Sequence, residues 1–208
     1  MEDSGPGVRT GIPAVCAPRA APAPAEPRRR PVLSFPEGDV VVVSGLPGSG
    51  KSTLIRRTVP EGVQRVDSQN VRDRWAAGPA GRWLPYAVYR PLVRVSHYRG
   101  LLRALRGGHS LVVHDCGVLP WVRWGIERSV RRSGRGMHLV LLDVDPETAL
   151  DGQTARGRRV SRYAFARHRR ATGRLRAAVA RGGTGYPAVV LDRAGADAVR
   201  RFRFGSLD

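Results

Sequence analysis

The sequence VVVVSGLPGSGKST at residues 40–53 decides the fold. Its four consecutive valines predict a strand that is buried on both faces, because an unbroken β-branched run is typical of a parallel sheet covered by helices. The stretch from Gly45 to Ser52 fits the pattern G-x-x-x-x-G-K-[ST] at every fixed position, between this strand and a helix predicted over 52–58. A strand, a glycine-rich turn and a helix in this order predict a loop that binds phosphate.

The chemistry of this loop predicts a site for a nucleoside triphosphate. Its glycines let successive backbone N–H groups point at a phosphate, and the helix that follows adds the positive end of its dipole. We expect Lys51 to reach the β- and γ-phosphates of ATP and the Ser52 hydroxyl to ligate Mg²⁺. Lys51 is the only lysine among the 36 lysine and arginine residues of the chain, so a compact ammonium is kept at this one place. The predicted nucleotide-binding residues are Gly45, Leu46, Pro47, Gly48, Ser49, Gly50, Lys51, Ser52 and Thr53.

Strands and helices alternate along the rest of the chain. Short apolar runs predict further strands at 64–67, 110–114, 137–143 and 187–192. Helices are predicted at 68–76, 85–106, 120–132, 146–157 and 161–181, with a short helix ending the chain. This alternation predicts an α/β fold with a five-stranded parallel sheet and helices on both faces.

Residues 1–36 are predicted to be a disordered tail rich in proline, alanine and arginine, ahead of one domain at 37–208. The tail holds 8 of the 16 prolines and no periodic apolar pattern. It lacks the basic and apolar regions of a secretory signal, and no run of apolar residues is long enough to predict a membrane span. Two cysteines exclude a disulfide scaffold, so we expect a reducing, cytoplasmic location.

The formal net charge of the chain is +19 at pH 7. A charge of this size favours a polyanionic partner such as nucleic acid. The near-total use of arginine instead of lysine is also typical of a biased genome composition, so one arginine by itself is weak support for a site. No compact sequence-reading module for nucleic acid is found. Nucleic acid therefore remains an open partner beside a small molecule.

Two motifs, VSGLPGSGKST at 43–53 and VDSQNVR at 66–72, resemble the AAA-type ATP-binding kinase group. That group includes polynucleotide 5′-kinases, zeta toxins and chloramphenicol phosphotransferase. The resemblance covers about residues 40–192 and implies a P-loop NTPase fold similar to adenylate kinase, with a short basic lid. It implies ATP and Mg²⁺, and phosphoryl transfer to a hydroxyl. A GTPase is excluded, because its N-K-x-D motif needs a second lysine.

The resemblance also assigns roles to three residues outside the loop. Asp67 follows the second strand, where relatives hold the carboxylate that accepts the proton of the attacking hydroxyl; capping the next helix is the alternative. Arg72 matches an arginine that contacts acceptor or phosphate in relatives, and a solvated helix arginine is the alternative. Asp115 resembles the Walker B carboxylate, which holds Mg²⁺ through water, and it too can cap the next element.

The segment QTARGRRVS at 153–161 resembles the lid of these kinases. The resemblance implies that Arg156 closes over the phosphates and neutralises charge in the transition state. Relatives carry a further arginine one turn earlier, where this chain has Gly152 and Gln153. That arginine is therefore either absent from this chain or replaced by Arg158 or Arg159.

The region 74–98 mixes tryptophan and tyrosine with arginine and is expected to cover the acceptor. Its aromatic residues can stack on bases or pack as core. Three functions remain open: a kinase of a small hydroxylated molecule, a kinase of nucleic-acid 5′-ends, and a nucleotide-gated binding protein with slow ATP hydrolysis. The first is favoured, because Gly117 stands where polynucleotide kinases tend to carry asparagine.

Overall fold

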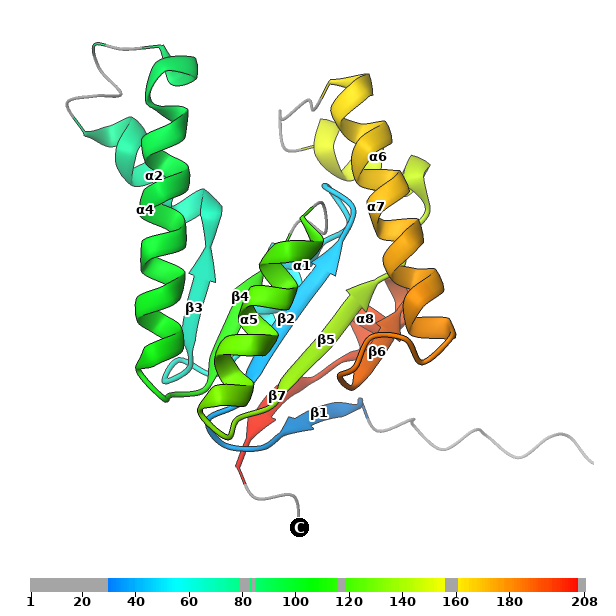
Figure 1. Cartoon of the computed structure of the whole chain (residues 1–208). Helices are drawn as coiled ribbons and strands as arrows, with labels where there is room; N and C mark the ends of the chain where they lie inside the picture. The colour runs from blue at the N-terminus through cyan, green and yellow to red at the C-terminus, as the bar shows by residue number, and fades with distance from the viewer. Residues whose placement is uncertain (1–29, 79–82, 84, 116–118, 156–160, 206–208) are drawn as a thin grey trace, which may run out of the picture.

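A parallel sheet of five strands runs through the centre of the molecule (Figure 1), in the order β3-β4-β2-β5-β6. The computed structural model describes residues 30–78, 83, 85–115, 119–155 and 161–205. The strands are β2 (Val40–Gly45), β3 (Gln64–Asp67), β4 (Leu111–His114), β5 (Met137–Leu142) and β6 (Ala188–Leu191). Each neighbouring pair is parallel, which confirms the predicted α/β fold with a five-stranded sheet.

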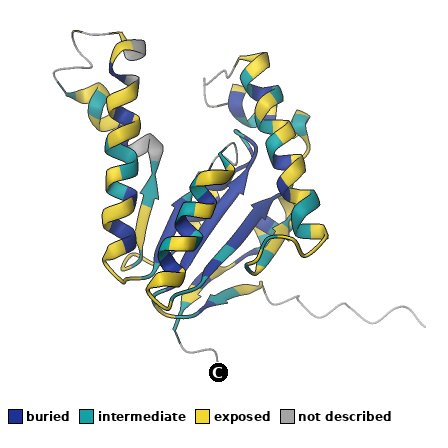
Figure 2. Ribbon diagram, in the orientation of Figure 1, coloured by how far each residue is buried: buried dark blue, intermediate teal, exposed yellow. Residues whose placement is uncertain are grey.

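Helices cover both faces of this sheet. On one face lie α1 (Lys51–Thr58) and α8 (Arg193–Ala198), and on the other lie α4 (Tyr86–Arg106), α5 (Pro120–Arg132) and α7 (Arg162–Ala180). The valines of β2 alternate between the two cores, because successive side chains of a strand point to opposite faces. Val41 and Val43 pack against α1, whereas Val40 and Val42 pack toward α4 and α5. In Figure 2 the central strands β2, β4 and β5 are buried, whereas the edge strands β3 and β6 and the outer sides of the helices are partly or fully exposed.

Two further helices lie beyond the carboxyl ends of the strands (Figure 1). Helix α2 (Ser68–Ala77) follows β3 directly and packs against α4, where the rings of Trp75 and Tyr89 stack at 6.4 Å. Helix α6 (Pro146–Thr154) follows β5. Within the described residues, no helix has the length and apolar character that crossing a bilayer requires.

A second, two-stranded sheet corrects two expectations. Strand β1 (Val32–Phe35) pairs in parallel with β7 (Arg201–Phe204), so this part of the expected 1–36 tail belongs to the domain, and a strand follows the final helix. Phe35 and Phe202 are buried, and their rings meet edge to face at 5.4 Å. Both strands are only four residues long, and arginines occupy the exposed positions of β7. Residues 1–29 lie outside the described part of the chain.

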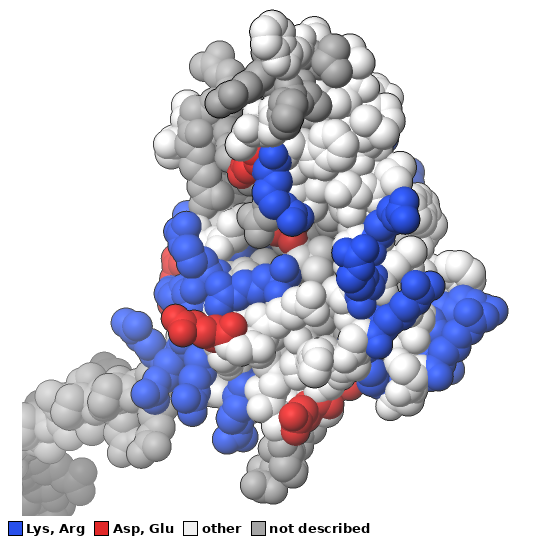
Figure 3. Space-filling view, turned by 90° about the vertical axis from the view of Figure 1, so that its left-hand side faces the viewer, with Lys and Arg blue, Asp and Glu red and all other residues white. Residues whose placement is uncertain are grey.

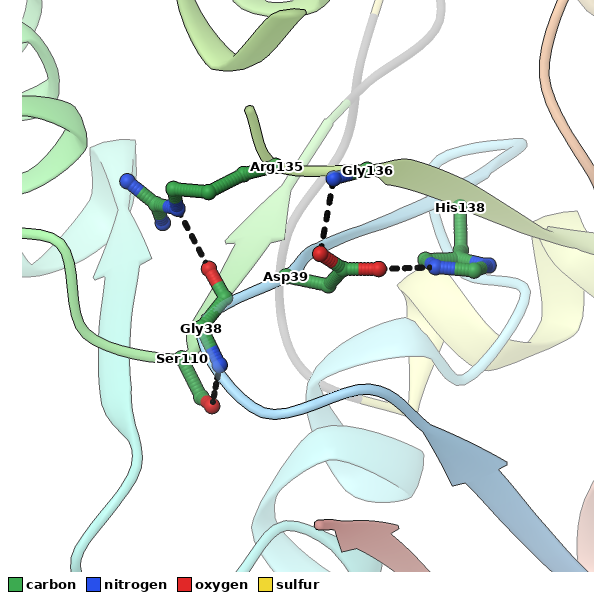
Figure 4. Close-up of polar contacts among 6 residues, drawn as sticks. All are labelled: Gly38, Asp39, Ser110, Arg135, Gly136 and His138. Atoms are coloured by element: carbon green, nitrogen blue, oxygen red, sulfur yellow. Dashed lines mark hydrogen bonds and ion pairs between the residues drawn. The ribbon is translucent and has the colours of Figure 1, made fainter. Parts of the chain in front are cut away.

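A buried carboxylate joins β2 to β5 at the amino ends of the strands (Figure 4). Asp39 accepts a hydrogen bond from the backbone N–H of Gly136 at 2.7 Å, and its other oxygen lies 2.7 Å from Nε2 of His138. The loop before β5 is therefore fixed to the loop before β2.

The guanidinium of Arg135 joins the loop before β2 to the last turn of α4 and to the loop that follows α4. It donates hydrogen bonds to the carbonyl oxygens of Gly38, Leu105 and His109 (Figure 4 shows the first). The N–H of Gly38 in turn donates to Oγ of Ser110 at 2.9 Å. The polar groups at the amino end of the sheet therefore hold the loops there together. The candidate site lies at the opposite, carboxyl end.

Candidate active site

The glycine-rich loop connects the end of β2 to the start of α1, as the sequence predicts. Gly48 has φ of 89°, and a Cβ built there would lie 1.9 Å from the carbonyl oxygen of Ala149. Only glycine fits this position, because both the left-handed backbone and the neighbouring helix exclude a side chain. Helix α1 begins at Lys51, so its first N–H groups and its dipole face the loop.

Lys51 is folded into the loop. Its Nζ donates hydrogen bonds to the carbonyl oxygens of Gly45 at 2.9 Å and Leu46 at 2.7 Å, and the residue is only 5% exposed. A buried ammonium is stable only with strong hydrogen-bond acceptors around it. The positive charge is therefore held inside the loop, in contact with its backbone.

Helix α6 rests directly on the loop. A Cβ built on Gly152 would lie 2.5 Å from the carbonyl oxygen of Gly48, so backbone meets backbone at this point. The buried side chain of Gln153 donates from Nε2 to the carbonyl oxygen of Pro47 at 3.1 Å. The sequence had marked these two positions only as the place where relatives carry an arginine. In the structure, Gly152 and Gln153 are the residues through which α6 packs on the loop.

Asp67 and His114 lie opposite each other on neighbouring strands. Their Cα atoms are paired in the β3–β4 register, and Nδ1 of His114 lies 2.8 Å from Oδ1 of Asp67. Both side chains are largely buried, and neither ring nitrogen makes a well-directed hydrogen bond among the described residues. The ring of His114 therefore lies against the carboxylate of the predicted base.

Asp115 follows β4 and is buried between two partners. Nη1 of Arg123 donates to its Oδ2 at 2.9 Å, and Oγ of Ser44 donates to the same oxygen at 3.3 Å. Arg123 also donates to Tyr186, whose pKa is raised by burial and lowered in part by the arginine. The carboxylate predicted as Walker B therefore stands beside β2, with its charge already matched by a buried cation.

Arg123 was not predicted as a site residue, although the sequence carries a signal for it. Arg123, Ile126 and Val130 are the buried residues of α5 and follow the 3-4 spacing of its inner face. A charged residue at a core position of an amphipathic helix needs a buried partner. Only the fold shows that this partner is Asp115.

His97 on α4 completes the group of side chains around Asp67. Burial lowers its pKa, the carboxylate of Asp67 opposes this effect, and His114 adds to it. His97 thus remains neutral at neutral pH. Its ring contacts Tyr98 at 5.3 Å, and Tyr98 contacts Trp121 of α5 at the same distance.

The other predicted site residues are either exposed, packed in a core or outside the described part of the chain. Arg72 lies exposed on α2. The lid arginines Arg156, Arg158 and Arg159 lie outside the described residues, as does Gly117. Of the aromatic residues predicted near the acceptor, Tyr89 is buried in a small core with Val71 and Val93, so it packs instead of presenting a stacking surface.

The loop fits the phosphates of ATP. Lys51 and the start of α1 lie at the loop, and Oγ of Ser49 is buried with no hydrogen-bond partner among the described residues. Those residues hold no group of three or more His, Cys, Asp or Glu side chains that could bind a metal by themselves. Mg²⁺ is usually held by one or two carboxylates together with substrate phosphates and water, so Ser52 and Asp115 are a fitting donor set.

Comparison with protein families gives one match. A family model described as an AAA domain matches residues 40–201. No curated protein matches the chain.

Solved structures match the fold at low sequence identity. A candidate kinase from Chloroflexus aurantiacus J-10-fl is 16% identical, with 74% of this chain and 84% of that chain covered and a TM-score of 0.53. A gluconokinase from Sinorhizobium meliloti 1021 is 18% identical, with 80% and 90% covered and a TM-score of 0.47. The PezAT toxin–antitoxin system of Streptococcus pneumoniae is 17% identical, with 62% and 55% covered and a TM-score of 0.48. Together with the family match, the first of these confirms the resemblance to small P-loop kinases.

Proposed function

We propose, from the premise that this chain belongs to the AAA domain family that its residues 40–201 match, that it is an ATP-dependent phosphotransferase acting on a hydroxyl of a small molecule. One observation carries the proposal. Asp67 ends β3 at the same carboxyl edge of the sheet as the phosphate-binding loop, and only β4 lies between β3 and β2. A nucleotide-gated binding protein has little need of a carboxylate on this side of the loop.

Different residues of the chain are assigned to the phosphates and to the metal ion. The loop backbone from Gly45 to Gly50 and the ammonium of Lys51 hold the β- and γ-phosphates, and Ser52 with Asp115 holds Mg²⁺. Bound Mg²⁺ neutralises charge on the phosphate oxygens. Because Ser44 and Arg123 both bind Oδ2 of Asp115, Oδ1 is the oxygen of this carboxylate that would help to hold Mg²⁺.

Asp67 acts on the acceptor. The hydroxyl oxygen forms a bond to the γ-phosphorus, the bond from this phosphorus to the β–γ bridging oxygen breaks, and ADP leaves with that electron pair. Asp67 accepts the hydroxyl proton, and His114 at 2.8 Å holds the carboxylate in place. Arg156, with Arg158 or Arg159, is assigned to the charge that develops on the transferred group. Arg72 is assigned to the acceptor or its new phosphate. The need for ATP and the two cysteines favour a cytoplasmic location.

The test is ADP release from Mg-ATP in the presence of separate acceptors: polyols, sugars, nucleosides, antibiotics and a 5′-hydroxyl oligonucleotide. We expect one small-molecule class to raise ADP release above the basal rate and to gain the phosphate. Lys51→Ala should abolish both rates. If the oligonucleotide is the sole acceptor, the nucleic-acid alternative replaces the proposal. If no acceptor raises the rate, and basal hydrolysis is the same in Asp67→Asn, the protein is a nucleotide-gated binding protein.

A further inference from the structure

The outer face of α4 carries a line of exposed aliphatic side chains. Steps of four and three residues from Val88 reach positions 92, 95, 99, 102 and 106, which lie along one face of a helix. Val88, Leu92, Val95 and Leu102 on this line are between 49% and 58% exposed. Its other two members, Arg99 and Arg106, are exposed as well. These six residues are called the α4 stripe.

Helix α4 is apolar on two sides, and the fold buries only one of them. Its inner side contributes Leu101, Ala104 and Leu105 to the core between α4, α5 and the sheet. A helix that is apolar all round is usually covered all round. Scattered exposed aliphatic residues are ordinary, but a contiguous line of them is typical of a surface that binds a partner.

Two aromatic rings extend this apolar surface from α4 to α5. Tyr98 follows Val95 by three residues and precedes Leu102 by four, so it borders the α4 stripe. Its ring lies 5.3 Å from that of Trp121, an exposed residue of α5. Tryptophan is enriched where one protein binds another, so its exposure beside the stripe fits a protein interface.

Helix α7 shows that the arginine bias of the chain does not by itself produce such a stripe. Arginine predominates on the exposed side of α7, where Tyr163 is the one large apolar residue. That side is an ordinary solvated face. The exposed aliphatic line is therefore a property of α4 and not of arginine-rich helices in general.

The charges of α4 indicate which partner fits the stripe. The helix contains five arginines and no acidic residue. Arg94, Arg99 and Arg106 are exposed, and none of them forms an ion pair among the described residues. Basic side chains also predominate over acidic ones on the face of the molecule that carries α4 (Figure 3). The surface is thus complementary to carboxylates.

This charge pattern disfavours two other occupants. The α4 stripe of a second copy would bring arginine against arginine, and like charges in contact oppose association. The phosphate backbone of a nucleic acid would match the arginines, but its phosphates and sugars offer no apolar surface to Leu92 and Val95.

We propose that the α4 stripe binds an acidic amphipathic helix of another protein. From Val88 to Leu102 the stripe is about 21 Å long at 1.5 Å per residue, so the partner contributes about four helical turns. Its aliphatic side chains, spaced three and four residues apart, pack on Val88, Leu92 and Val95. Its carboxylates pair with Arg99 and Arg106. The proposal does not depend on the reaction assigned to the site.

The first experiment compares three labelled peptides of about 20 residues, long enough to form a helix. The first has leucine at spacings of three and four, with alanine and glutamate elsewhere. The second replaces each glutamate by lysine, and the third contains the residues of the first in an order that destroys the spacing. Fluorescence anisotropy measures their affinity for the full wild-type chain. We expect the first to bind at least about tenfold more tightly than the others, because it alone matches both charge and spacing.

Two pairs of variants locate the binding of the first peptide. Leu92→Gln removes an aliphatic side chain of the stripe, and Leu150→Gln makes the same change at an exposed position of α6. Arg99→Gln removes a cation of the stripe, and Arg170→Gln removes an exposed cation of α7. We expect each α4 variant to weaken binding about tenfold and each control to leave it unchanged. All four positions are exposed, and thermal melting checks that the variants are folded.

Three results would overturn the inference: the acidic amphipathic peptide does not bind, the peptide of altered order binds equally well, or the control variants weaken binding as much as the α4 variants. Two further results would replace the proposed occupant. A wild-type dimer in sedimentation that becomes a monomer in Leu92→Gln would assign the stripe to a second copy. A duplex oligonucleotide that displaces the peptide, and binds more weakly to Leu92→Gln, would assign it to nucleic acid.

Discussion

Buried charges dominate the site at the scale of single residues. Asp67, Asp115, Lys51 and Arg123 all lie at the carboxyl ends of the strands, and each has a partner that limits its motion. Such pairs keep catalytic groups in position, and they make the removal of one member costly. Substitutions at these residues are therefore tested both for the rate of phosphoryl transfer and for the free energy of unfolding.

Asp67→Asn should reduce phosphoryl transfer by about 10²–10⁴-fold, the usual range for lost general-base help. ATP affinity should be retained, because the groups that hold the phosphates are untouched. Calorimetric ATP affinity beside the transfer rate checks this. Asp73→Asn, the same change at an exposed position of α2, is the control and should alter neither quantity. Wild-type transfer by Asp67→Asn would leave the helix-capping role for this residue.

Arg123→Met should lower the free energy of unfolding by about 3 kcal/mol, because Asp115 would remain buried without its cation. Urea denaturation measures this loss. Arg132→Met, at an exposed position of the same helix, should have little effect. Adding Asp115→Asn to Arg123→Met should restore part of the stability. An unchanged midpoint in Arg123→Met would show that the pair is not buried in solution.

Residue types were readable from the sequence, but their partners were not. The loop at 45–52 is a local pattern, so its site was predictable residue by residue. The pairing of Asp67 with His114 depends on β3 lying beside β4, which is a property of the sheet order. The contact of Gln153 with Pro47 joins residues 106 positions apart. No local pattern contains such information.

Close packing of α6 on the loop is the main feature at the scale of elements. Helix α6 leads directly into the predicted lid, and it contacts the loop through backbone at Gly48 and Gly152. Any displacement of α6 therefore changes the surroundings of the loop. This arrangement couples the start of the lid segment to the nucleotide site.

Gly152→Ala tests this packing, because the close contact and the helix propensity of alanine change the stability of the protein in opposite directions. Alanine is the better helix former by about 1 kcal/mol, but here its Cβ would lie 2.5 Å from the carbonyl oxygen of Gly48. We expect a net destabilisation of about 1–3 kcal/mol and weaker ATP binding, since the loop or α6 must shift. Gly173→Ala on α7, where nothing lies within 4 Å, should stabilise the protein instead. Thermal melting with and without ATP measures both the stability and the binding of ATP. A higher melting temperature in Gly152→Ala would contradict the close approach of α6 to the loop.

The sequence predicted the five-stranded sheet but not the small one. Four valines in β2, and five apolar residues among the six of β5, are strong local signals. VLSF and RFRF are short, and their burial results from pairing with each other across the whole chain. The tail boundary at residue 36 was therefore placed too late.

Truncation tests that boundary at the scale of the whole molecule. Deleting residues 1–29 should leave the melting temperature nearly unchanged, whereas deleting 1–36 removes β1 and should lower it markedly. Phe35→Ala gives the expected size of the effect, a loss of about 3–5 kcal/mol, because this ring packs on Phe202, Phe204 and His138. Differential scanning calorimetry of the two truncations is the measurement. Equal melting temperatures would place β1 outside the cooperative unit.

The parallel pairing of β1 with β7 also determines how the domain responds to a pulling force. The chain enters this pair at Val32 and leaves it at Phe204, at opposite ends of the two strands. Tension applied between the two ends of the chain therefore acts along both strands in opposite directions and loads their hydrogen bonds together, in shear. An antiparallel terminal pair would open one bond at a time. The pair of β1 and β7 is therefore expected to resist such a force as a unit, and it is the first pair of strands that the force loads.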